Sequence, residues 1–101
     1  MTSRHILSSR AETDLQDIHA YGFAHFGRER AAAYILGLGS AFELIAAYRH
    51  LGRIDTAFTP VIHRFEHAEH IILYDTYESH IVIVRVLHKA ADMGAHTNME
   101  R

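Results

Sequence analysis

The side chains best suited to chemistry gather between residues 63 and 70, where histidines lie close to glutamates: His63, Glu66, His67, Glu69 and His70. Imidazole and carboxylate groups are common zinc ligands. If Glu66 pairs with Glu69 across a hairpin, His63 and His70 become diagonal neighbours about 7–8 Å apart. That separation is loose for two ligands of one metal, and no His-x-x-x-His helix motif supports a site. We therefore interpret these groups as surface and half-buried side chains, and predict no bound metal and no cofactor. A metal- or pH-sensing role for the ten histidines is a lesser alternative.

Nucleophilic and phosphate-binding motifs are not apparent. The serines at positions 8, 9, 40 and 79 lack a Gly-x-Ser-x-Gly elbow, and the glycines at 37, 39 and 52 do not match a phosphate-binding loop. Cysteine is absent, which excludes disulfides, cysteine nucleophiles and thiolate zinc sites. The sequence therefore gives almost no support for acyl or phosphoryl transfer.

Arg85 interrupts an otherwise apolar segment, so its guanidinium must reach water or be paired. One interpretation is a structural ion pair with Asp75 or Asp92. The other places Arg85 and His88 at the exit of the last strand, facing a ligand. Paired charges arise for both reasons, and the sequence leaves both open.

Length and charge limit the function classes. The 101 residues predict a single domain over 1–101. A formal net charge of −2 argues against broad phosphate-backbone binding, so we expect no direct, specific DNA binding by this chain. No apolar run suggests a signal peptide or a membrane span, and the lack of cysteine suits a cytoplasmic protein.

The first half of the chain predicts a helical hairpin. Residues 4–8 form a short strand, and Ser9 with Glu12 has the pattern of a capping box at the start of a helix. Apolar residues then recur at helical spacing up to Gly27, and again over 28–48. Close approach of the first helix is one reason to tolerate Gly37 and Gly39 within the second.

The second half changes to the two-residue period of strands. Residues 49–60 are predicted as a loop, followed by strands at 61–66, 70–75 and 80–88 and by an irregular tail from about Lys89. The fold class is therefore α+β, in the order β-α-α-β-β-β, with the helical hairpin on one face of a small, mostly antiparallel sheet. The expected core comprises Leu15, Ile18, Ile35, Leu38, Phe42, Ile72, Tyr74, Ile83 and Val84 or Val86.

Motifs along nearly the whole chain resemble the ParE toxins of the RelE/ParE superfamily, from bacterial type II toxin–antitoxin modules. The motifs are Ser9-x-Ala11-x-x-Asp14-Leu15-x-x-Ile18-x-x-Tyr21, Phe26-Gly27, Leu51-Gly52-Arg53, Phe65-x-x-x-x-His70-x-Ile72-x-Tyr74, and Ile83-Val84-Arg85-Val86-Leu87-His88-x-x-x-Asp92-Met93. The last of these is the most specific, and their shared order and spacing strengthen the resemblance.

The resemblance implies a toxin that is not an enzyme: it would bind DNA gyrase and block replication. It also implies a cognate ParD-like antitoxin that forms a hetero-oligomer with the toxin by folding onto it. Together with the charge pattern, it suggests antitoxin contacts at Arg53, Arg64, Phe65 and Arg85, since arginine makes bidentate pairs with carboxylates. Target contacts are expected in the tail, at His88, Lys89, Asp92, Met93 and His96.

Two alternatives stay open. One is a RelE-type ribosome-dependent mRNA endoribonuclease, a chemistry that needs an acid or base and cations near the phosphorane. Arg53, Arg64, Arg85, His88 and Lys89 could supply part of that charge, although the chain lacks a dense basic set. The other alternative is an inactive or retargeted toxin homologue.

Overall fold

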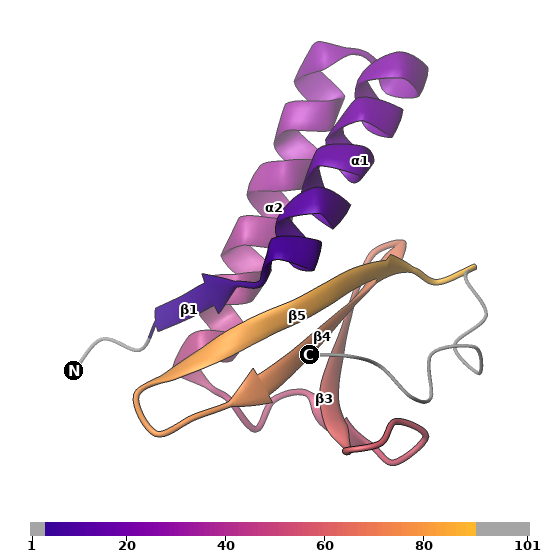
Figure 1. The fold of residues 1–101 in the computed structure, drawn as a ribbon. Helices are drawn as coiled ribbons and strands as arrows, with labels where there is room; N and C mark the ends of the chain where they lie inside the picture. The colour runs from indigo at the N-terminus through magenta and orange to yellow at the C-terminus, as the bar shows by residue number, and fades with distance from the viewer. Residues whose placement is uncertain (1–3, 91–101) are drawn as a thin grey trace.

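A computed structural model describes residues 4–90, so Asp92, Met93 and His96 lie outside the described part of the chain. Two helices pack on one face of a sheet, and their far ends project beyond it (Figure 1). The elements are β1 (Arg4–Leu7), α1 (Ser9–Phe26), α2 (Arg28–Ala47), β2 (Arg53–Asp55), β3 (Ile62–His67), β4 (His70–Thr76) and β5 (His80–His88).

The sheet has five strands in the order β1-β5-β4-β3-β2, and only the β1–β5 pair is parallel. The predicted α+β class and mostly antiparallel sheet are confirmed. The prediction of a plain loop over residues 49–60 is wrong, because Arg53–Asp55 pairs with β3 as an edge strand. Three residues are too few for the strand period to show in a sequence.

The helix α1 begins one residue earlier than predicted. Ser8, not Ser9, is the N-cap, and its hydroxyl accepts a hydrogen bond from the Ala11 N–H at 3.0 Å. The predicted capping box between Ser9 and Glu12 is therefore wrong. Ser8 takes this position because its own N–H donates to the Ile83 carbonyl at 3.0 Å, which fixes the chain at the end of β1.

The turn between the helices lies at Gly27, as the sequence predicts, and its φ of 90° favours glycine. The glycine at which the two helices come close together is Gly22, and not Gly37 or Gly39 as expected. A Cβ at Gly22 would lie 3.3 Å from the Cβ of Ala31, whereas one at Gly37 would meet the His67 ring and one at Gly39 would meet nothing within 4 Å. The expectation that Gly37 and Gly39 admit the first helix is wrong.

The main core lies between the helical hairpin and the sheet. Of the predicted core residues, Leu38, Phe42, Ile72, Tyr74, Ile83 and Val86 are buried there, and Leu15, Ile18 and Ile35 pack against it partly buried. Val84 belongs to a second cluster on the opposite face of the sheet, where Phe58 from the β2–β3 loop covers Ile71, Leu73 and Leu87. Both faces of β5 are thus covered, which explains its continuous apolar sequence.

The helix α2 is long and apolar enough, by length and composition alone, to cross a membrane, contrary to the expectation that no segment is. Its buried residues include Leu38, Phe42 and Ile45, and these pack into the core above the sheet. The core helix of a globular protein meets the same criterion.

The β3–β4 hairpin has a different register from the one assumed for a metal site. His67 pairs with His70 and Glu66 with Ile71, so the supposed Glu66–Glu69 pair is wrong. His63 pairs with Tyr74 at the other end of the hairpin and is not a neighbour of His70. The turn is made by Ala68 and Glu69, and Ala68 takes a positive φ of 49°.

Candidate interaction surfaces

Arg85 is paired with a residue from the first helix. Its Nε and Nη2 donate to the two carboxylate oxygens of Asp14, at 2.8 and 2.9 Å, and this bond raises the pKa of the guanidinium. The suggestion of Asp75 as its partner is wrong, and Asp92 lies outside the described residues. The sequence did not point to Asp14 as the partner because 71 residues separate it from Arg85.

The same carboxylate protects the edge of β5 beyond the end of β1. The Val86 N–H donates to Asp14 Oδ2 at 2.9 Å, and the Ser8 hydroxyl donates to the Val84 carbonyl at 2.7 Å. Side chains from the start of α1 therefore continue the pairing that β1 makes as far as Ile83. Covering an unpaired strand edge in this way restricts pairing with other chains.

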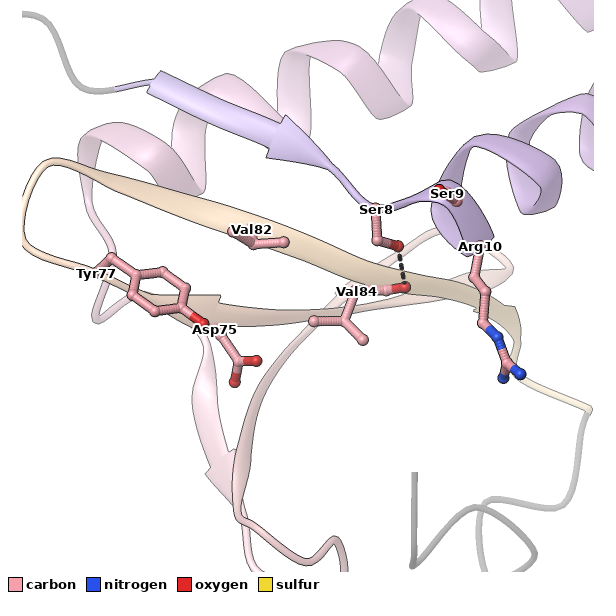
Figure 2. Close-up of a pocket in the computed structure, with 7 residues that line it drawn as sticks. All are labelled: Ser8, Ser9, Arg10, Asp75, Tyr77, Val82 and Val84. Carbon is pink, nitrogen blue, oxygen red and sulfur yellow. Dashed lines mark hydrogen bonds between the residues drawn. The ribbon is translucent and has the colours of Figure 1, made fainter. Parts of the chain in front are cut away.

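A pocket of about 460 Å³ lies beside this edge. Figure 2 shows Val82 and Val84 along β5, with Asp75 and Tyr77 at one end of the pocket and Arg10 at the other. The dashed line marks the bond from Ser8 to Val84. Apolar side chains and groups of both charges line this pocket together, a composition that suits contact with another protein chain.

Three predicted binding residues come together on the sheet face opposite the helices. Arg64 bonds Asp55 at 3.0 Å and Glu66 at 3.4 Å; Lys89 lies 3.5 Å from Glu66, and Arg53 lies 4.0 Å from it. We call these five residues the Glu66 cluster. Its three cations outnumber its two carboxylates, so it carries a net positive charge.

The members of the Glu66 cluster differ in exposure. The Arg64 side chain is only 14% exposed and its Nε has no hydrogen-bond partner within the described residues, whereas the Arg53 side chain is 71% exposed. Exposed ion pairs contribute little to stability, about 0–1 kcal/mol. Arg53 can therefore exchange its contact with Glu66 for a new carboxylate at small cost, whereas Arg64 is fixed within the cluster.

The remaining predicted residues lie apart from the Glu66 cluster. Phe65 is half-buried and packs against the main core on the helix-facing side of β3. His88 is exposed at the end of β5 and lines a second pocket, of about 290 Å³, between the helical hairpin and the sheet. The sequence alone did not predict that Tyr34 and Arg30 of α2 line this pocket. They lie near the end of β5 only because the helical hairpin packs on the sheet.

No group of three or more histidine, aspartate or glutamate side chains within residues 4–90 is arranged to hold a metal ion. Of the eleven exposed large apolar side chains within residues 4–90, six lie on the helices or at the C-cap of α2. On α2 they are Leu36, 73% exposed, and Leu44, followed at its C-cap by Tyr48, 66% exposed; on α1 they are Tyr21, Phe23 and Phe26. Apolar surface of this kind marks sites of protein–protein contact.

The chain is similar to known proteins along nearly its whole length. Residues 6–93 match the family model described as ParE toxin of type II toxin-antitoxin system, parDE. Toxin ParE1 of Caulobacter vibrioides is 33% identical over 90 residues, which cover 89% of this chain and 93% of that protein. Toxin ParE1 of Mycobacterium tuberculosis is 31% identical over 94 residues, covering 92% of this chain and 96% of that one.

The fold is also that of a known structure. The chromosomal ParDE TA system from P. aeruginosa contains a chain that matches with a TM-score of 0.68 at 17% identity, over 87% of this chain and 96% of that one. The family match spans every described strand and helix apart from the first two residues of β1. The chain belongs to the ParE toxin family of type II toxin–antitoxin systems.

Proposed function

We propose that this ParE-type toxin acts in the cytoplasm by binding DNA gyrase, so that replication stops, and that a cognate ParD-like antitoxin neutralises it. The observation that carries the proposal is the family match over residues 6–93, together with the two ParE1 relatives that align along nearly their whole length. The motif from Ile83 to Met93 resembles the closing strand motif of ParE toxins. This resemblance supports the choice of gyrase as the target.

The charge arrangement favours action by binding over RNA cleavage. An endoribonuclease needs a positioned acid or base and cations directed at the reacting phosphate. Here Arg85 is engaged by Asp14, and Arg64 is engaged by Asp55 and Glu66. Each of these cations already faces at least one carboxylate, which lowers the positive charge that it could direct at a phosphorane.

The antitoxin would fold along the exposed apolar side chains of the hairpin and reach the Glu66 cluster with acidic residues. Leu36, Leu44 and Tyr48 offer apolar anchors for an amphipathic segment that folds on binding. Arg53 would form a new carboxylate pair, while Arg64 and Arg85 would each donate a further hydrogen bond to an antitoxin carboxylate and keep their present partners. Phe65 would contribute through its exposed edge.

Arginine variants test this interface. We expect Arg53→Ala to weaken binding of the purified antitoxin roughly tenfold, in line with the loss of one charge-assisted pair, and to leave thermal stability unchanged. Arg64→Ala and Arg85→Ala should weaken binding as well as stability. Arg28→Ala, at the start of α2, serves as the exposed control. Unaltered affinity in all three folded variants would place the antitoxin elsewhere.

The target would be bound by the end of β5 and the segment after it. His88 and Lys89 lie there, and Asp92, Met93 and His96 follow outside the described residues. A chain that ends at Ala91 keeps Lys89, whose N–H bonds the Glu69 carbonyl at 2.9 Å, and removes residues 92–101, among them Asp92, Met93 and His96. We expect it to fold and to inhibit gyrase less strongly. Inhibition at full strength by the folded truncation would contradict the proposed role of the tail.

The activity itself is tested with purified gyrase, a supercoiling substrate and a parallel mRNA-cleavage reaction on ribosomes. The proposal predicts loss of supercoiling, accumulation of cleaved DNA, and recovery on addition of antitoxin. Cleavage of mRNA with gyrase unaffected would replace it with the ribonuclease alternative, and inactivity of the folded protein in both reactions would indicate an inactive or retargeted homologue.

A further inference from the structure

Three histidines occupy paired positions on neighbouring strands. His67 of β3 pairs with His70 of β4, and His70 pairs with His88 of β5. Directly paired residues project from the same face of a sheet, so these imidazoles form a row across three strands. The rings of His70 and His88 lie 5.2 Å apart, and Tyr34 of α2 stands over the row, 5.3 Å from His70 and 5.9 Å from His67.

The Tyr34 hydroxyl joins the central histidine to α2. It accepts a hydrogen bond from the Glu69 N–H at 3.3 Å and lies 2.5 Å from His70 Nδ1. In the tautomer with its proton on Nε2, His70 accepts the proton of this hydroxyl at Nδ1. A protonated imidazole carries a proton on both nitrogens and has no acceptor to offer. Protonation of His70 therefore obliges the hydroxyl to accept a second hydrogen bond in place of the one it donates.

The surroundings of His70 oppose its protonation. It is only 9% exposed, and this burial lowers its pKa most, followed by the charges that His88 and His67 would carry on either side. Glu69 in the turn and Asp14 on α1 act in the opposite direction. Arg30 of α2 lines the same pocket and adds a further positive charge.

We propose that the row of His67, His70 and His88, together with Tyr34, is an acid-sensitive latch between the helical hairpin and the sheet. At neutral pH His70 is uncharged and Tyr34 holds α2 on β4. On acidification His70 gains a charge between two other histidines, the Tyr34–His70 bond must exchange its donor and acceptor, and the pocket between hairpin and sheet opens. This inference rests on the histidine row and on the register of its three strands. It does not depend on which target the toxin binds.

The direction of the effect follows from proton linkage. An exposed histidine in the unfolded or locally opened chain protonates at its ordinary pKa, near 6.5. His70 in the closed state protonates only at lower pH. Opening therefore takes up a proton in the interval between the two values, so the closed state is fully stable above about pH 6.5 and weakens as the pH falls through that interval.

Nuclear magnetic resonance of the full chain tests the latch. Long-range ¹⁵N–¹H spectra between about pH 7.5 and about pH 5 should show His70 with its proton on Nε2 and with a pKa below the ordinary value of histidine, near 6.5. Over this range, amide protection next to Tyr34 should fall at least tenfold after correction for intrinsic exchange, while protection at Ile83 is retained. A proton on Nδ1 at neutral pH, or titration of His70 at or above its ordinary value, would overturn the proposal.

Variants separate the latch from general acid sensitivity. His70→Gln cannot titrate and should reduce the acid-induced loss of protection at Tyr34 to less than twofold. His88→Gln, at the exposed end of the row, removes one flanking charge and should raise the pKa of His70. This second variant tests the proposal if His70→Gln does not fold. His19→Gln on the outer side of α1 is the matched control and should behave as the unmodified protein. An unchanged acid response in folded His70→Gln, or an unchanged His70 pKa in His88→Gln, would contradict the proposal.

Discussion

Replacing Gly52 by alanine should be among the most damaging small substitutions in this protein. Gly52 precedes β2 and lies against Tyr74, whose hydroxyl accepts from the Gly52 N–H and donates to the Arg49 carbonyl, both at 2.9 Å. A Cβ at this position would lie 2.5 Å from the Tyr74 oxygen and 2.7 Å from the backbone oxygen of Arg64. Side-chain motion cannot relieve a contact with backbone, so the two strands must move apart.

The expected cost combines overpacking with weakened hydrogen bonds. Forcing extra volume into a packed site costs about 1–3 kcal/mol. Each hydrogen bond of Tyr74 that is stretched adds about 0.5–1.5 kcal/mol. A total of about 2–6 kcal/mol is a large part of the roughly 5–15 kcal/mol by which such domains are stable.

Urea unfolding followed by circular dichroism measures this cost, and Gly39→Ala is the matched control. A Cβ at Gly39 would meet nothing within 4 Å, and alanine is favoured over glycine within a helix by about 1 kcal/mol. We therefore expect opposite changes: the unfolding midpoint falls for Gly52→Ala and rises for Gly39→Ala. If Gly52→Ala kept the midpoint of the unmodified protein, the close packing of this loop on Tyr74 would be refuted.

Four further substitutions test other parts of the fold by the same unfolding measurement. Ser8→Ala should cost about 0.5–2 kcal/mol as the loss of a helix cap, whereas Ser9→Ala should change stability by less than about 0.5 kcal/mol; equal effects would contradict the assignment of the cap. Phe42→Ala removes a ring that is 2% exposed in the main core and should cost about 3–5 kcal/mol; an unchanged midpoint would reject that placement. Asp14→Ala leaves the Arg85 guanidinium and a β5 N–H without their acceptor and should cost about 1.5–3 kcal/mol; a neutral result would show that water replaces the carboxylate.

Local sequence patterns were sufficient for the helices and the longer strands. The turn at Gly27, the apolar face of α2 and the apolar run of β5 all appear in the described structure where their periods predict them. These features depend on neighbours along the chain, and a sequence displays such neighbours directly.

The errors arose where a distant residue decides the outcome. Adjacent serines at 8 and 9 are equally good caps by themselves, and the choice depends on pairing of Ser8 with β5. The hairpin register depends on Ala68 accepting a positive φ, for which the residue type gives no signal. The carboxylate partner of Arg85 lies on another element.

The predicted binding residues were partly brought together. Arg53, Arg64 and Lys89 meet around Glu66 because β2 and β3 pair and β5 ends nearby. The β2–β3 pairing could not be read from three strand residues. The histidine row depends on the same kind of information, since it becomes visible only when the register of three strands is known.

The central claim, that this toxin acts by binding rather than by turnover, is tested most directly by stoichiometry. Gyrase at a concentration well above the dissociation constant is titrated with toxin, and supercoiling is measured at each ratio. A binding inhibitor gives a linear loss of activity that ends at a fixed ratio of toxin to gyrase, and added antitoxin restores the activity. A catalytic toxin would contradict the account by inactivating many substrate molecules, gyrase or RNA, for each molecule of toxin added.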